Sequence, residues 1–187
     1  MKLSASDVTK LYGADAPDGE RQSAFEAGNI NVAVYGLGKM GLPVATVFAS
    51  ITGRVLGVDV DEGVVDQVND GACPVRGEPR LPGMVRATVD AGAMRATTEA
   101  VTAASWADFH VVLVPTTVDE AARTDLSNLE TAVRSIAVGL EAGDMVVIES
   151  TVPPGTCADV VQPTLVEESG LAAGEFGVAF CPERTQS

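Results

Sequence analysis

The chain has 187 residues, 46% of them hydrophobic, which is enough for one substantial core and excludes an intrinsically disordered protein. Asp and Glu outnumber Lys and Arg by 26 to 12, giving a net charge of −14, so we expect no nucleic-acid or anionic-membrane surface. No apolar run approaches the roughly 20 residues of a membrane span, and residues 1–7 lack the apolar core of a signal peptide, so we expect a cytoplasmic location.

The acidic residues are spread along the chain, lysine is scarce and aromatics make up 4% of residues. This composition predicts a protein adapted to high salt, with an ordinary acidic cytosolic protein as the alternative. The three cysteines, Cys73, Cys157 and Cys181, are far apart and form no C-x-x-C pair, so neither a structural metal nor a disulfide framework is expected. The only histidine, His110, lies in an apolar strand-like run, which favours a packed or edge-facing side chain over a catalytic one.

Residues 1–29 differ from the rest of the chain. A short helix is expected over 6–12, a Gly/Asp/Pro stretch over 13–19 and a second short helix over 20–27. We interpret them as an N-terminal extension, with a flexible arm and a partner-contacting arm both left open.

A glycine-rich turn follows the first apolar strand, 31–35, and opens a helix over 41–51. Gly36, Gly38 and Gly41 have the spacing G-x-G-x-x-G of a dinucleotide site. The first glycine permits the tight turn, the second lets the backbone approach a pyrophosphate, and the third lets the helix pack on the strand. Glycine turns of this kind also occur for packing alone.

A second apolar strand, 54–58, ends in Asp59, which is 23 residues after Gly36. That offset is near the ~20 residues expected for the acid that binds the adenosine ribose hydroxyls. The next residues are Val60, Asp61 and Glu62, which would repel a 2′-phosphate. NAD is therefore favoured over NADP.

The remaining pattern alternates helices and strands. Helices are expected over 61–69, 84–91, 98–104, 126–140 and 156–169, strands over 94–97, 109–115, 145–149 and 178–181, and a loop over 71–83. This alternation over residues 30–187 predicts an α/β fold, a Rossmann-like doubly wound, mostly parallel sheet of about six strands.

Four expected strand ends carry polar or glycine-rich loops, at 36–41, 115–117, 150–155 and 182–184. Ligands of doubly wound sheets bind beyond the carboxyl ends of the strands. The loops are therefore expected to converge on one crevice.

Together these loops carry five motifs in order, G-L-G-x-x-G-L-P, G-V-D, V-P-T, E-S-T-V-P-P-G-T and C-P-E-R. From about residue 30 to the end the chain resembles the UDP-glucose/GDP-mannose dehydrogenase family. C-P-E-R is more similar to the UDP-N-acetylmannosamine branch than to the UDP-glucose branch, where P-E-F is commoner.

The resemblance implies oxidation of the C6 alcohol of a UDP-sugar to the uronic acid with two NAD+, through a cysteine-bound thiohemiacetal and thioester, in polysaccharide biosynthesis. The nucleophilic cysteine, a lysine and an asparagine belong to later domains in the family. We therefore expect this chain to be the NAD-binding part of a longer, homo-oligomeric enzyme. By itself this part is expected to be inactive.

The resemblance also implies roles for individual residues. Cofactor-binding residues would be Gly36, Leu37, Gly38, Met40 and Gly41 at the pyrophosphate turn, Asp59 at the adenosine ribose, Pro115, Thr116 and Thr117 in the loop after the 109–115 strand, and Thr151 beside the nicotinamide.

The catalytic residues implied by the resemblance are Thr151 and Glu183. The threonine hydroxyl would hold the water used in hydrolysis, and the carboxylate would accept its proton. The alternatives without a catalytic role are that Thr151 caps the following loop and that Glu183 is a surface acid after a strand.

The chain departs from the family pattern at several positions. Thr117 stands where the family usually has proline, and Lys39 where it often has an apolar residue. Ser187 occupies the place of a second acid found in some members. Cys181 precedes a proline at a strand end and does not match the motif of the family's nucleophile.

Two other functions remain open from the sequence. A 3-hydroxyacid dehydrogenase of the phosphogluconate type shares the G-L-G-x-M-G turn, although the E-S-T-V-P-P-G-T and C-P-E-R loops oppose it. A non-catalytic NAD-sensing regulatory module would need no Thr151 and Glu183 at the nicotinamide end.

Overall fold

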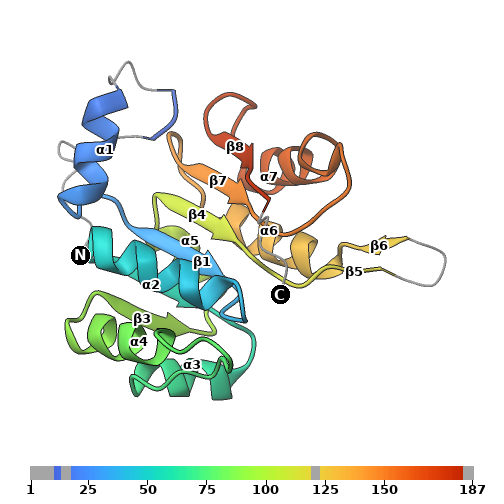
Figure 1. Ribbon diagram of the computed structural model, residues 1–187. Helices are drawn as coiled ribbons and strands as arrows, with labels where there is room; N and C mark the ends of the chain where they lie inside the picture. The colour runs from blue at the N-terminus through green and yellow to red at the C-terminus, as the bar shows by residue number, and fades with distance from the viewer. Residues whose placement is uncertain (1–10, 14–17, 119–122, 183–187) are drawn as a thin grey trace.

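A six-stranded parallel sheet forms the centre of the computed structural model, which describes residues 11–13, 18–118 and 123–182 (Figure 1). Its strands, in spatial order, are β3 Met94–Thr97, β2 Val55–Val58, β1 Val32–Tyr35, β4 Phe109–Val112, β7 Met145–Ile148 and β8 Gly177–Phe180. Neighbouring strands pair in parallel throughout, and the order of the chain reverses between β1 and β4. The predicted Rossmann-like fold is thereby confirmed, with its switch point at β1 and β4.

Helices cover both faces of the sheet. They are α1 Asp18–Glu26, α2 Gly41–Thr52, α3 Glu62–Asn69, α4 Leu81–Asp90, α5 Ala100–Trp106, α6 Ser127–Gly139 and α7 Gln162–Ser169, and a π-helical turn, η1 Cys157–Val161, precedes α7. In the view of Figure 1, α1 and α2 lie in front of the sheet, and α5 and α6 lie behind it.

Strand β1 is buried on both faces, which explains its unbroken apolar sequence. Val32 and Val34 point into the core beneath α2, and Ala33 and Tyr35 point into the core beneath α5 and α6. The strand thus joins the two cores and carries the glycine turn at its carboxyl end.

Several boundaries differ from the sequence predictions. Strand β4 ends at Val112, and a small hairpin of β5 Thr117–Val118 and β6 Thr124–Asp125 follows where only a loop was expected. Helix α4 begins at Leu81, three residues early, because Pro82 suits the first helical turn, where no hydrogen bond from its nitrogen is needed. The helix expected over 6–12 lies largely outside the described residues.

The described parts of the N-terminal extension contact the sheet. The N–H groups of Leu11 and Tyr12 both donate to the Gly143 carbonyl at 3.0 Å. Phe25 of α1 packs edge-to-face on Phe109 of β4, with 5.4 Å between ring centroids. The extension therefore adds to the core that α2 covers.

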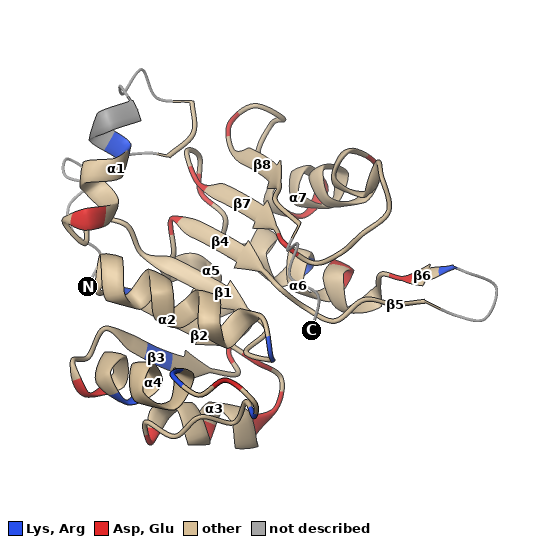
Figure 2. Ribbon diagram, in the orientation of Figure 1, with Lys and Arg blue, Asp and Glu red and all other residues tan. Residues whose placement is uncertain are grey.

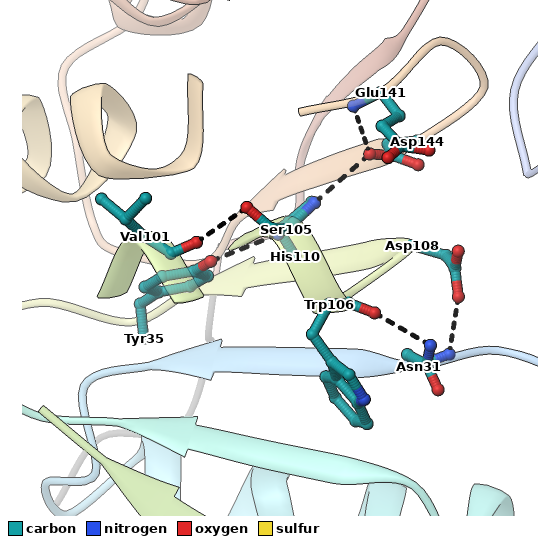
Figure 3. Close-up of polar contacts among 9 residues, drawn as sticks. All are labelled: Asn31, Tyr35, Val101, Ser105, Trp106, Asp108, His110, Glu141 and Asp144. Carbon is teal, nitrogen blue, oxygen red and sulfur yellow. Dashed lines mark hydrogen bonds and ion pairs between the residues drawn. The ribbon is translucent and has the colours of Figure 1, made fainter. Parts of the chain in front are cut away.

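His110 is fully buried on β4, and this confirms the prediction of a packed histidine. Its Nδ1 lies 3.3 Å from the Tyr35 hydroxyl, and its Nε2 lies 3.8 Å from Asp144 Oδ2 (Figure 3). Burial, together with the nearby Asp144 charge, raises the pKa of Tyr35 far above its ordinary value. The phenol therefore stays neutral.

Candidate cofactor site

The glycine turn after β1 is held by contacts that exclude side chains. Gly36 has φ +93°, its N–H donates to the Val58 carbonyl at 2.7 Å, and a Cβ there would lie 3.0 Å from the Leu113 carbonyl carbon and closer still to its oxygen. A Cβ on Gly41 would lie 2.9 Å from the Gly36 carbonyl carbon and would overlap its oxygen. Both positions therefore require glycine.

Gly38 is different, because a Cβ built there meets nothing within 4 Å and the residue is exposed. No internal packing within the described structure demands a glycine at this place. Open backbone at the second glycine, followed by the N-terminus of α2, is the geometry that lets a pyrophosphate approach. Met40 stands at the N-cap of α2 and is half-buried beside this opening.

Asp59 lies directly beside the turn. Its Oδ2 accepts a hydrogen bond from the Leu37 N–H at 2.8 Å, and its Oδ1 accepts one from the Asp61 N–H at 3.0 Å. The carboxylate is thereby oriented, while each oxygen retains a lone pair for a ribose hydroxyl. The Leu37 side chain itself is buried and packs on Gly57.

Two loops on the other half of the sheet are tied together. The Thr116 hydroxyl donates to the Thr151 carbonyl at 2.8 Å, across 35 residues of sequence. Ser150 is buried and donates through Oγ to the Val114 carbonyl at 2.9 Å. The Asn128 amide donates to the Pro115 carbonyl at 3.1 Å. The loops after β4 and β7 therefore form one unit at the carboxyl edge.

The Thr151 side chain is exposed at this edge, and Thr117 next to the loop is also exposed, in β5. The π-helical turn η1 follows shortly afterwards, and such turns are frequent at functional sites. Glu183, the other predicted catalytic residue, lies outside the described residues.

A cleft of about 710 Å³ adjoins the same edge. Val44, Val47 and Phe48 of α2 form one wall, and Glu149 and Cys181, at the ends of β7 and β8, lie on the other. The volume falls in the range of about 300–1,000 Å³ that small-molecule sites occupy. The cleft thus offers room for a ligand beside the loops after β7 and β8.

Ser150 and Asn128 hold the loops together, and the sequence pattern does not predict this role for either residue. Ser150 lies within the E-S-T-V-P-P-G-T motif, but nothing in the motif indicates its hydrogen bond. No local sequence pattern indicates the contact of Asn128, because its partner is 13 residues away. In the described part of the chain no cluster of three His, Cys, Asp or Glu residues is placed to hold a metal ion. No helix there is long and apolar enough to cross a membrane.

Residues 30–187 match the NAD binding domain of the UDP-glucose/GDP-mannose dehydrogenase family. The chain belongs to this family. The resemblance drawn from the five motifs is therefore confirmed, and NAD is the cofactor that the glycine turn and Asp59 suit. The match also argues against the hydroxyacid dehydrogenase alternative.

Individual relatives are identical to this chain at slightly more than a third of the aligned positions. It is 39% identical over 160 residues to the NDP-N-acetyl-D-galactosaminuronic acid dehydrogenase of Ralstonia nicotianae, covering 82% of the chain and 37% of the relative. It is 35% identical over 161 residues to the UDP-N-acetyl-D-mannosamine dehydrogenase of Escherichia coli K12, with the same coverage.

Among solved structures, the GDP-mannose dehydrogenase of Pseudomonas aeruginosa in a ternary complex superposes with a TM-score of 0.79 at 31% identity. That comparison covers 84% of this chain and 37% of the other. The chain thus spans a little over a third of the length of these relatives. These comparisons show the fold and the family of the chain, and they do not show its substrate.

Proposed function

We propose that this chain is the NAD-binding part of a nucleotide-sugar 6-dehydrogenase, which oxidises the C6 alcohol of a UDP-sugar to the uronic acid. The observation that carries the proposal is the Thr116–Thr151 hydrogen bond, which joins the loops after β4 and β7 at the edge that also bears the glycine turn and Asp59. A sensor of NAD would need the turn and the acid but not this second pair of loops.

The overall reaction consumes one UDP-sugar, one water and two NAD+, and yields one carboxylate, two NADH and three protons. When bound, NAD+ is the hydride acceptor for each of the two oxidations. On this proposal the Thr151 hydroxyl, exposed at the carboxyl edge, orients the water that attacks the oxidised C6 carbon. Glu183 accepts the proton that the water loses.

The proposed sugar is UDP-N-acetylmannosamine, with UDP-glucose second. The C-P-E-R ending supports this order, as does the name of the Escherichia coli relative at 35% identity. We propose further that the family's later domains supply most contacts to the sugar nucleotide and the covalent nucleophile. The chain by itself would then bind NAD without turnover.

The cofactor part is tested by calorimetric titration with NAD of the wild type, Asp59→Ala and Asp59→Asn. Hydrogen bonds to a charged group are worth about 1.5–3 kcal/mol each, so Asp59→Ala is expected to bind NAD at least about tenfold more weakly. Asp59→Asn keeps an acceptor oxygen for Leu37 N–H and should lose less. Equal affinity in all three proteins would remove Asp59 from the site.

The catalytic part is tested by following NADH absorbance with NAD and each UDP-sugar, for this chain and for any longer protein that contains it. Two NADH per sugar are expected from the longer protein, and none from the chain alone. In the active protein Thr151→Val should lower the maximal rate, and Thr102→Val, an exposed threonine on α5, should not. A longer protein that binds NAD but oxidises neither sugar would instead favour the NAD-sensing module.

A further inference from the structure

A second cavity lies at the opposite edge of the sheet, beside the amino ends of β2 and β3. It has a volume of about 280 Å³, and Arg54, Arg95 and Trp106 lie along its wall. The volume is just below the usual range of small-molecule sites, so the cavity suits one compact ligand. None of the five family motifs falls on it.

Arg54 is held in place through only one of its nitrogens. Its Nε donates to Asn31 Oδ1 at 2.6 Å, and Asn31 Nδ2 donates in turn to the Trp106 carbonyl at 2.9 Å. The Asn31 N–H donates to Asp108 Oδ2 at 2.9 Å, which fixes Asn31 itself (Figure 3). Asn31 therefore links the Arg54 guanidinium to the end of α5 that carries Trp106.

The remaining donors of Arg54 have no partner within the described parts of the chain. A guanidinium carries five N–H donors in a fixed fork, and here the fork is oriented while its two terminal nitrogens stay available. Preorganisation of this kind is what an oxyanion site needs, since little side-chain freedom remains to be lost on binding.

Arg95 supplies a second charge to the same cavity. It is exposed on edge strand β3, directly opposite Leu56 of β2, and it has no ion pair with any described residue. Arg54 likewise forms no ion pair with any described residue. Two guanidinium groups on one cavity repel each other, and an anion between them would remove that repulsion.

We propose that this cavity binds a compact anion in which a carboxylate or phosphate is joined to a ring. Arg54 and Arg95 hold the oxyanion, and the Trp106 indole provides a flat surface for the ring. The cavity and the glycine turn lie at opposite ends of parallel strands that are four residues, or about 13 Å, long. NAD and the anion can therefore bind together, and this inference does not rest on the proposed function.

Trp106 is the only tryptophan, so tryptophan fluorescence reports on the wall of this cavity and the core beside it. The whole chain is titrated with benzoate, uridine 5′-monophosphate and inorganic phosphate, which separates an aromatic carboxylate from a nucleotide and from the bare oxyanion. At least one ring-bearing anion is expected to change the emission with saturation and to bind at least tenfold more tightly than phosphate. No saturable change with either ring-bearing anion would overturn the proposal, as would equal binding of phosphate.

Substitutions test whether Arg95 and Arg54 bind the anion. Arg95→Gln is the main test, because the exposed side chain can be exchanged without disturbing the core, and at least a tenfold loss of anion affinity is expected. Arg86→Gln, an exposed arginine on α4, makes the same charge change elsewhere and should leave anion binding unaltered. NAD affinity should be equal in both variants. Anion binding that survives Arg95→Gln together with Arg54→Gln would refute the site.

Discussion

The three glycines of the turn are expected to respond differently to alanine, and this separates packing from cofactor contact. At Gly41 an added Cβ lies 2.9 Å from the Gly36 carbonyl carbon and overlaps its oxygen, whereas ordinary contact begins at about 3.4 Å. The turn or α2 must therefore shift by several tenths of an ångström or more. Overpacking of this kind costs about 1–3 kcal/mol, which for a chain of this size is a fall in Tm of roughly 2–12 °C.

At Gly38 the added Cβ meets nothing within 4 Å, and φ is not positive. Gly38→Ala should therefore keep the wild-type Tm, or raise it slightly because the unfolded chain loses freedom. The methyl group would nevertheless occupy the space into which the pyrophosphate comes. We expect NAD affinity to fall at least about tenfold, equivalent to 1.4 kcal/mol.

The assay is a thermal melt paired with an NAD titration, each made on the wild type, Gly38→Ala and Gly41→Ala. Gly41→Ala should lose stability and affinity together, and Gly38→Ala should lose affinity alone. If Gly38→Ala bound NAD as tightly as the wild type, the pyrophosphate would not lie on this turn and the reasoning would be refuted. Unchanged melting of Gly41→Ala would show that the close approach to Gly36 is not tight.

Three further outcomes are expected. Acidic side chains are spread over α1, α3, α7 and the loops (Figure 2), so molar KCl should screen their repulsion and raise Tm. A flat response would contradict the salt adaptation. Burial raises the pKa of the Cys157 thiol, so at pH 8 iodoacetamide should label exposed Cys181 first, and Cys157 labelling should accelerate only at higher pH; equal rates by mass spectrometry would oppose this. Phe25→Ala should lower Tm by roughly 1–6 °C through loss of the edge-to-face contact with Phe109, leaving NAD affinity unchanged, while Gln22→Ala on the exposed side of α1 serves as control.

Local sequence patterns were sufficient for the sheet and for the first half of the site. Strand β1 is apolar on both faces because both faces are buried, and the glycine turn follows it without a gap. Asp59 could be placed because it ends β2, which pairs with β1 in parallel, so the two strand ends must adjoin. In each case the deciding contact is between neighbours in the sheet.

Contacts between distant loops could not be predicted. The Thr116–Thr151 bond joins two loops that appear in sequence only as separate motifs. Strand β5 pairs with β6 through only two residues on each side, which are equally typical of a loop. Asn31 was assigned as the first residue of a strand, although it instead bonds to Arg54 and Trp106. Such side-chain bridges depend on where the whole fold brings its loops, and no local periodicity encodes them.

The position of β1 between β2 and β4 has a consequence for synthesis of the protein. Gly36 is made early, yet one wall of its turn is the backbone at Leu113, which leaves the ribosome 77 residues later. A nascent chain that carries β1, α2 and β2 therefore has an open sheet edge where β4 will pair. The cofactor turn completes its shape only after β4 emerges. A translational pause before residue 109 has left the ribosome would therefore leave an aggregation-prone intermediate, and a pause after residue 113 has left it would leave the turn enclosed.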